Sequence, residues 1–173
     1  MEKQILDPAC GGRMFYFDKH DPRVLFGDSR TFSGKLCDGR TFTVEPDEVM
    51  DFRNMPFKDE SFQLVIFDPP HLRRVGDNSW MKAKYGQLPP DGWKQYLKDG
   101  FDECWRVLAP GGTMVFKWNE HQIKIGRIKD CFPAPPPYGV CVQQAHGLRK
   151  ERRFQRTPRG CSVFRVVCVG ERI

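Results

Sequence analysis

The amino-acid sequence predicts an α/β protein with a mostly parallel sheet and helices on both faces. Short apolar runs of strand type alternate with polar turns that contain Gly or Pro, and residues 93–108 carry apolar side chains at helical spacing. Because the carboxyl ends of parallel strands meet at one edge of a sheet, ligands bind there. Four strand-type segments reach this edge with an aspartate, namely Asp7, Asp28, Asp51 and Asp68.

Composition limits the class of protein. The 173 residues suit one domain with a sizeable core. No apolar run approaches membrane-spanning length and no signal-peptide core follows Met1, so we expect a cytoplasmic protein without a membrane partner. Seven Cys without a Cys-x-x-Cys pair favour reduced, mostly buried thiols over disulfides or a zinc site. We therefore expect no metal, and these features leave the oligomeric state open.

The first two strands flank a glycine turn. Ile5-Leu6 leads into a polar segment that contains Gly11, and such a turn lets the backbone approach a nucleotide-like ligand. Residues 14–20 predict a short first helix, in which Phe15 lies beside the ligand or in the core. The second strand ends at Asp28, and an acidic residue there commonly accepts hydrogen bonds from ribose hydroxyls. The alternative to a ligand site is that this whole segment is an ordinary strand, turn and helix without a bound ligand.

Residues 30–45 predict a β-hairpin, because an Asp-Gly turn signal precedes a strand pattern. Its simplest interpretation is a structural flap. A third short strand then leads to Asp51 and Phe52. Taken alone, Asp51 is equally well a solvated loop residue.

The segment that carries the chemistry follows the next strand. Leu64–Phe67 is apolar, too short for a helix and followed by two prolines, so it predicts a buried strand that delivers Asp68 and His71 to the ligand edge. A carboxylate there could accept a hydrogen bond from a planar amine and orient its lone pair. Asp-Pro also begins many ordinary turns. An equal alternative is therefore that the strand ends at a turn without a functional role.

A long polar loop, residues 72–92, separates this strand from the helix. It interleaves cations with aromatic residues, which suits contact with phosphates and stacking on bases, although a solvated surface loop is nearly as good an interpretation. Trp118 and Asn119 end the fifth strand at the active edge, with a core position as the alternative for Trp118. The candidate substrate-binding residues are Arg73, Arg74, Trp80, Lys82, Lys84, Trp118 and Asn119.

Three segments resemble motifs of S-adenosylmethionine (SAM) dependent nucleic-acid methyltransferases. Asp-Pro-Pro-aromatic resembles their amine-methylating motif, in which the Asp and a proline-held carbonyl accept hydrogen bonds from the amine and the fourth residue stacks. Asp-Pro-Ala-Cys-Gly resembles the motif that supports the methionine part of SAM. Asp-x-x-x-hydrophobic-Pro-Phe resembles the motif that binds the adenine of SAM. The resemblance implies the catalytic residues Asp68, Pro69, Pro70 and His71. It implies the cofactor-binding residues Asp7, Cys10, Gly11, Phe15, Asp28, Asp51 and Phe52.

The motif order is similar to that of class I SAM-dependent methyltransferases over residues 5–139, and more narrowly to a small phage-associated group with Asp-Pro-Pro-His-Leu and Phe-Lys-Trp-Asn-Glu. This resemblance implies a Rossmann-like fold, SAM as cofactor, and methylation of an exocyclic amine of a nucleic acid, DNA rather than RNA, at adenine N6 or cytosine N4. In a duplex that amine is reachable only if the base is flipped out. The alternatives are methylation of an RNA base or a protein glutamine, and a catalytically silent subunit that binds SAM or nucleic acid.

The net charge of +6 is concentrated at the end of the chain. Residues 1–142 contain 20 Lys/Arg and 20 Asp/Glu, whereas residues 143–173 contain 8 Lys/Arg and 2 Asp/Glu. We therefore expect a methyltransferase domain over 1–142 and a basic tail over 143–173, with a strand pattern at 162–169. The tail is either a basic hairpin that holds nucleic acid or an altered terminus, as after a reading-frame change. We favour the altered terminus, because the resemblance ends where the charge begins.

Overall fold

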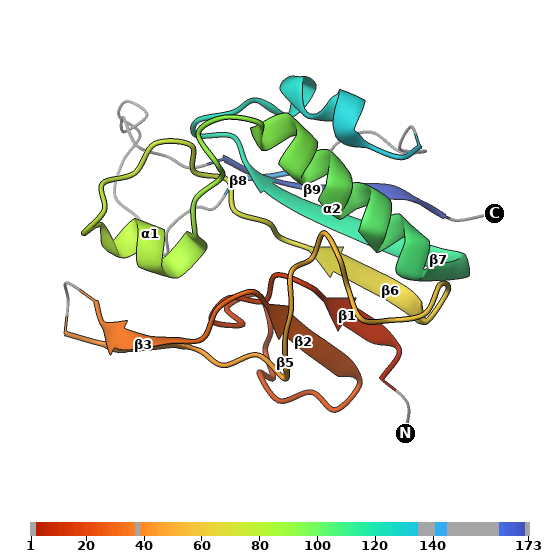
Figure 1. Ribbon diagram of the computed structural model, residues 1–173, viewed down its shortest axis with the longest axis horizontal. Helices are drawn as coiled ribbons and strands as arrows, with labels where there is room; N and C mark the ends of the chain where they lie inside the picture. Colours follow the sequence, from red (N-terminus) through yellow and green to blue (C-terminus); the bar gives the residue numbers. More distant parts are fainter. Residues whose placement is uncertain (1–2, 37–38, 135–140, 145–162, 172–173) are drawn as a thin grey trace, which may run out of the picture.

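A seven-stranded sheet forms the centre of the computed structural model, which describes residues 3–36, 39–134, 141–144 and 163–171 (Figure 1). The strands run in the order β5-β2-β1-β6-β7-β9-β8. Their bounds are β1 Ile5–Asp7, β2 Val24–Asp28, β5 Glu48–Val49, β6 Phe62–Phe67, β7 Leu108–Asn119, β8 Cys141–Gln144 and β9 Val163–Glu171. A separate hairpin pairs β3 (Phe32–Lys35) with β4 (Thr41–Val44).

Five of these strands, β1, β2, β5, β6 and β7, pair in parallel. Counted along the chain, they lie in the order third, second, first, fourth and fifth, which is the order of a doubly wound Rossmann sheet. The direction of winding reverses between β1 and β6, where Leu6 lies beside Val65. The chain therefore has the predicted Rossmann-like α/β fold, with its switch point at the ends of β1 and β6.

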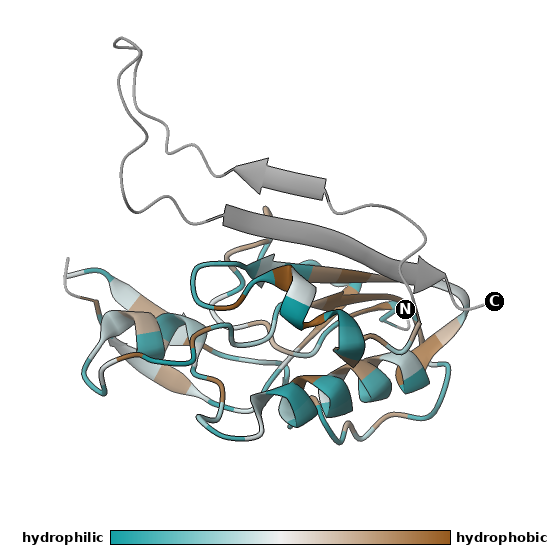
Figure 2. Ribbon diagram, turned by 90° about the horizontal axis from the view of Figure 1, so that it is seen from above, coloured by the Kyte–Doolittle hydropathy of each residue, from teal (hydrophilic) through white to brown (hydrophobic). Residues whose placement is uncertain are grey.

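Helix α2 (Trp93–Val107) lies across β6 and β7 on one face of the sheet (Figure 1). Its buried side chains include Leu97 and Phe101, which recur at helical spacing and join the main core. The Phe101 ring contacts Phe67 and Phe116, at centroid distances of 5.2 and 4.9 Å. Figure 2 shows hydrophilic residues over much of the visible surface of this helix. The helix predicted for 93–108 is confirmed.

Gly100, in α2, packs directly against two aromatic rings. A Cβ added there would lie 2.6 Å from Cδ2 of Phe52 and 2.9 Å from Cζ of Phe67. Gly100→Ala should therefore lower the free energy of unfolding by about 1–3 kcal/mol, although alanine elsewhere in a helix gains about 1 kcal/mol over glycine. Urea denaturation measures the change, with the exposed Asp102→Ala in the same helix as control. An equal or higher stability would mean that the two rings move aside at no cost.

Strand β7 begins at Leu108, whereas the sequence predicts a turn at residues 110–112 and a strand from Thr113. Gly111 and Gly112 lie in a bulge of the ladder: Phe62 lies opposite Leu108 and Leu64 opposite Thr113, and Gly111 has a φ of 75°. Such a bulge lets the chain pass directly from helix to strand.

The other face of the sheet, over β1 and β2, is covered by turns. The helix predicted for residues 14–20 is not formed. The carboxylates of Asp18 and Asp21 instead accept hydrogen bonds from the backbone N–H two residues later, at 2.8 and 3.0 Å, and such bonds compete with a helix. Tyr16, carried by these turns, packs on Phe26 with 4.8 Å between ring centroids.

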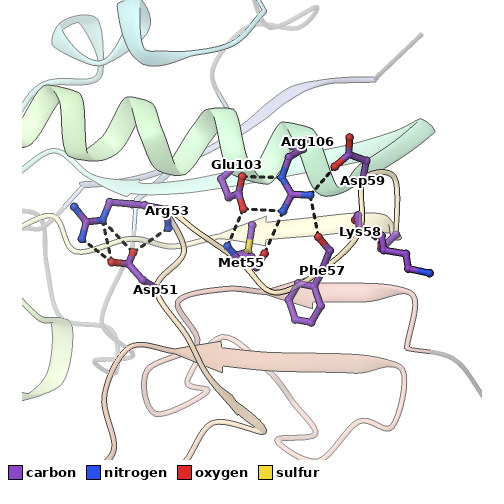
Figure 3. A network of polar contacts seen from close by, with 9 residues as sticks. Asp51, Arg53, Met55, Phe57, Lys58, Asp59, Glu103 and Arg106 are labelled. Atoms are coloured by element: carbon purple, nitrogen blue, oxygen red, sulfur yellow. Dashed lines mark hydrogen bonds and ion pairs between the residues drawn. The ribbon is translucent and has the colours of Figure 1, made fainter.

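The loop between β5 and β6 is anchored to α2 by Arg106 (Figure 3). Its guanidinium donates to the carboxylates of Glu103 and Asp59, at distances down to 2.6 Å, and to the carbonyl oxygens of Met55 and Phe57. Glu103 in turn accepts from the backbone N–H of Met55 at 2.7 Å. This network holds the loop that begins with Asp51 and Phe52 against the helix.

The tail contributes β9 and the second half of β8 to the sheet. β9 pairs antiparallel with β7, with Phe116 opposite Val167, and β8 pairs antiparallel with β9. The strand pattern at 162–169 is thus confirmed as β9. The Arg-rich stretch at residues 149–159 lies outside the described residues, so the division into domain and tail, and both interpretations of the tail's charge, stay predictions.

Three cysteines, Cys10, Cys104 and Cys131, are buried free thiols. Burial raises the pKa of each; for Cys10 it rises to about 12. Thiols that stay protonated at neutral pH are poor nucleophiles.

In the part of the chain that the structure covers, no helix is long and apolar enough to cross a membrane.

Candidate active site

The parallel strands point toward helix α1 (Trp80–Tyr85) and the β3–β4 hairpin, and a cavity of about 190 Å³ lies at their carboxyl ends (Figure 1). Asp7, Asp28 and Asp68 reach it from the ends of β1, β2 and β6. The fold thus brings three of the four predicted aspartates together. Other predicted residues that line the cavity are Cys10, Gly11, Phe15, Phe52, Pro69, Pro70, His71 and Lys84.

The glycine turn after β1 is tied to the end of β2. Gly11, with a φ of 50°, donates its backbone N–H to Oδ2 of Asp28 at 2.9 Å. Oδ1 of the same carboxylate accepts from N and Nε of Arg30, at 3.1 and 3.2 Å. Arg30 also donates from Nη1 to the carbonyl oxygen of Ala83 in α1, at 2.9 Å. Asp28 therefore orients both the turn and an arginine that holds α1 over the cavity.

Asp7 is buried beside Tyr16. The Tyr16 hydroxyl donates to Oδ2 of Asp7 at 2.9 Å, and the N–H of Ala9 donates to Oδ1 at 3.2 Å. Burial raises the pKa of Asp7 to about 7; the Tyr16 hydrogen bond opposes this rise, and the negative charge of Asp68 adds to it. Asp7 therefore changes its charge near neutral pH.

This pKa predicts how stability depends on pH. Between pH 4 and 7 the folded protein holds a proton on Asp7 that the unfolded chain, with a carboxyl pKa near 3.8, releases. Because the folded state binds more protons in this window, Asp7 lowers the free energy of unfolding as the pH rises through it. Asp7→Asn should remove that loss. Measured by urea denaturation, the free energy of unfolding of the variant should therefore rise relative to that of the wild type between pH 4.5 and 7.5. Parallel pH profiles of the two proteins would contradict the prediction.

Asp68 forms an ion pair with Lys117, which reaches the cavity from β7. Burial raises the pKa of Asp68 above its ordinary value, while the charge and hydrogen bond of Lys117 oppose the rise. The ammonium group also lies over the Phe15 ring, 5.4 Å from its centroid. Lys117 thus favours the ionised form of Asp68, against the effect of burial.

His71 is buried with 5% exposure. Its ring lies 5.2 Å from that of Tyr85 in α1 and 6.2 Å from that of Trp118, measured between centroids. Burial, together with the charges of Lys117 and His121, lowers the pKa of His71 to about 4. The imidazole is therefore neutral at physiological pH.

The predicted loop at 72–92 contains helix α1, whose N-cap Ser79 accepts a hydrogen bond from the N–H of Met81. Lys84 lines the central cavity, whereas Trp80 and Lys82 line a neighbouring groove of about 770 Å³. The second wall of this groove is the β3–β4 hairpin, and it shares Arg30, Gly86 and Gln87 with the cavity. The hairpin is thus more than a flap, because it forms part of the approach to the site.

Arg73 and Arg74 lie at the base of this loop, outside the cavity lining. Their backbone N–H groups donate to Oε1 of Gln122 at 2.8 and 2.9 Å. The Arg73 guanidinium lies 5.8 Å from the Trp93 ring centroid. In this structure the two arginines connect the loop to the segment after β7.

Asp51, Trp118 and Asn119 also lie outside the cavity lining. Asp51 forms a two-point ion pair with Arg53, at distances down to 2.6 Å (Figure 3). Trp118 is fully buried, and its indole N–H donates to the carbonyl oxygen of Ile123 at 2.9 Å. Oδ1 of Asn119 accepts from the N–H of His121 at 2.8 Å. These contacts place Trp118 in the core, the alternative that the sequence left open.

Several residues at the site escaped the sequence analysis. They are Tyr16, Arg30, Tyr96 and Lys117. Lys117 had a detectable signal, because a lysine between two apolar residues in a strand faces the side opposite to theirs and needs a partner. For the remaining three, no local pattern indicates the contact.

The sequence matches no family model and no curated protein. Two solved structures are similar in fold. The crystal structure of the PH0226 protein from Pyrococcus horikoshii OT3 is 16% identical, with 95% of this chain and 81% of that chain covered and a TM-score of 0.44. The crystal structure of PH0851 is 14% identical at a TM-score of 0.46; the match covers 96% of this chain and 42% of that one. With both scores below 0.5, the fold assignment depends on the strand order described above.

Proposed function

We propose that this chain transfers a methyl group from SAM to an exocyclic amine nitrogen of a DNA base, adenine N6 or cytosine N4. The observation that carries the proposal is the meeting of Asp7, Asp28 and Asp68 at one cavity beside the switch point of a Rossmann-like sheet. The motif resemblance requires acidic cofactor residues and the Asp-Pro-Pro segment at one cavity, although Asp51, which it assigns to adenine, lies outside the lining.

The chemistry follows from the planar amine. Its lone pair is delocalised into the ring, so it is a poor nucleophile, and an ionised Asp68 that accepts one of its N–H bonds favours a more tetrahedral nitrogen. The Lys117 ion pair supports this role because it favours the carboxylate in a buried place. Pro69 and Pro70 restrict the backbone from Asp68 to Pro70, where the motif resemblance places a carbonyl acceptor for the second N–H. SAM, when bound, would supply an electrophilic methyl group on a sulfonium: the S–C bond would break as the N–C bond forms, and S-adenosylhomocysteine would leave as a neutral thioether. The nitrogen, by then positively charged, would release one proton through its hydrogen bond to Asp68.

The residues at the cavity suit SAM. Asp28 and Gly11 together offer an acceptor and a close backbone approach. The central cavity, at about 190 Å³, is smaller than the roughly 300–1,000 Å³ of typical small-molecule sites, but the adjoining groove of about 770 Å³ extends it. The groove also carries Lys35 and Lys82 next to Trp80, a combination that supports a nucleic-acid partner.

Asp28→Ala should weaken SAM binding by about 10- to 100-fold, because a charge-assisted hydrogen bond to a ribose hydroxyl is lost. The same change removes the acceptor that orients Gly11, which acts in the same direction. Titration calorimetry on the folded variant measures the affinity, with the exposed Asp102→Ala as the matched control. An unchanged dissociation constant would exclude Asp28 from the cofactor site.

The proposed activity is tested with labelled SAM and separate pools of DNA, RNA and protein, followed by identification of the modified atom. We expect label in DNA at N6 of adenine or N4 of cytosine. Label in RNA, or on a glutamine amide nitrogen, would move the proposal to one of the alternative substrates. If SAM binds but no pool is labelled, the chain is a silent binding subunit.

A further inference from the structure

His71 presents a buried ring nitrogen that the fold itself leaves without a hydrogen bond. Among the residues that the structure describes, none provides a partner for Nε2, although the atom is fully buried and the residue lines the cavity. An unpaired buried polar atom destabilises a folded protein. A ligand bound in the cavity that His71 lines is the candidate for the missing partner.

Two aromatic rings pack against that of His71. The Tyr85 ring contacts it at a tilt of 55° and the Trp118 ring at 78°, so aromatic side chains hold it from two sides. The stacking role that the motif resemblance assigns to the fourth residue therefore has little room here. In a neutral imidazole one nitrogen donates and the other accepts, so Nε2 can act as a donor.

We propose that Nε2 of His71 donates a hydrogen bond to the ring nitrogen next to the reacting amine, so that the target base is read at its edge. This inference rests on the proposed function. Asp68 and His71 belong to one turn stiffened by two prolines, and both line the same cavity. An amine held by Asp68 can thus place its neighbouring acceptor toward His71.

The proposal defines a substrate class. In cytosine, N3 lies next to the carbon that carries the amine, and in adenine N1 does. Both are acceptors on the Watson–Crick edge, and both become accessible once the base has left the duplex. Alkyl amines carry no such acceptor and would leave Nε2 unpaired, which disfavours them by the same desolvation cost.

The experiment combines protein and substrate variants. Oligonucleotides that contain the base labelled by the wild type are compared with the same oligonucleotides carrying 3-deazacytosine or 1-deazaadenine, in which the acceptor nitrogen is a C–H group. The proteins are wild type, His71→Phe, which keeps an aromatic ring without a nitrogen, and His71→Gln, whose amide nitrogen reaches a position like that of Nε2. SAM affinity and urea denaturation are measured for each protein.

For the wild type, we expect kcat/KM to fall by about 10- to 100-fold on the deaza substrate. His71→Phe should lose a similar factor on the natural base and should no longer distinguish the two substrates, since the partner atom is absent from the protein. His71→Gln should recover part of the discrimination. SAM affinity should be unchanged, and the stability of His71→Phe should be equal to or higher than that of the wild type, because an unpaired polar atom has been removed.

Two results would overturn the inference while the proposed function stands. One is a wild type that methylates natural and deaza bases equally well, a comparison that needs no variant to fold. The other is a His71→Phe protein that keeps full activity, or that loses activity and still discriminates as the wild type does. A wild type that labels no nucleic acid would instead end the proposed function, and the inference with it.

Discussion

Replacing Asp68 with Asn should lower kcat for methyl transfer by about 100- to 1,000-fold while SAM affinity stays within a few-fold. The side chain keeps its size, but it loses the charge that pairs with Lys117 and that would polarise the amine. The lost interaction belongs mainly to the transition state, where the nitrogen becomes positively charged. The defect should therefore appear in kcat rather than in binding.

The measurement is single-turnover transfer of labelled methyl at saturating SAM, together with calorimetry of SAM binding. Asp102→Asn, on the exposed side of α2, is the matched control for the loss of one carboxylate. A variant that keeps its turnover on every substrate pool would reduce the Asp-Pro-Pro-His segment to a turn. A variant that loses SAM binding by the same factor as turnover would place Asp68 in the cofactor site instead.

Trp118→Ala should lower the free energy of unfolding by about 3–5 kcal/mol. The side chain is fully buried, stacks on Phe116 at 5.6 Å between centroids, and donates to the carbonyl oxygen of Ile123. Its removal leaves a cavity and an unpaired acceptor, and it also withdraws one of the two rings that hold His71. Transfer activity should therefore fall as well.

Urea denaturation decides between the two roles of Trp118 that the sequence left open. Trp118→Phe serves as the comparison, because it keeps an aromatic ring in the core and loses only volume and the indole hydrogen bond. It should restore most of the stability and much of the activity. If Trp118→Ala were as stable as the wild type and had lost only transfer, the residue would contact substrate despite its burial.

Strand and helix positions could be predicted because they depend on patterns a few residues long. The apolar run that ends at Phe67 and the helical spacing from Trp93 onward are such patterns, and both elements appear where expected. The meeting of Asp7 with Asp68 was also predictable, since parallel strands bring their carboxyl ends to one edge. The helix expected at 14–20 failed for a local reason: aspartates that cap their own turns outweighed an apolar pattern.

By itself, then, the sequence determined the kinds of elements, their order, and which side chains stand at the ends of the strands, because these follow from the chain's local periodicity. Only the tertiary structure decided which side chains contact one another at the site. Lys117 meets Asp68 across 49 residues, and Arg30 meets Ala83 across 53. Such contacts depend on strand register and on how a loop packs, which no short segment encodes. The unpaired Nε2 of His71 is a result of the same kind, because only the assembled cavity shows which polar atoms the fold has left for a ligand.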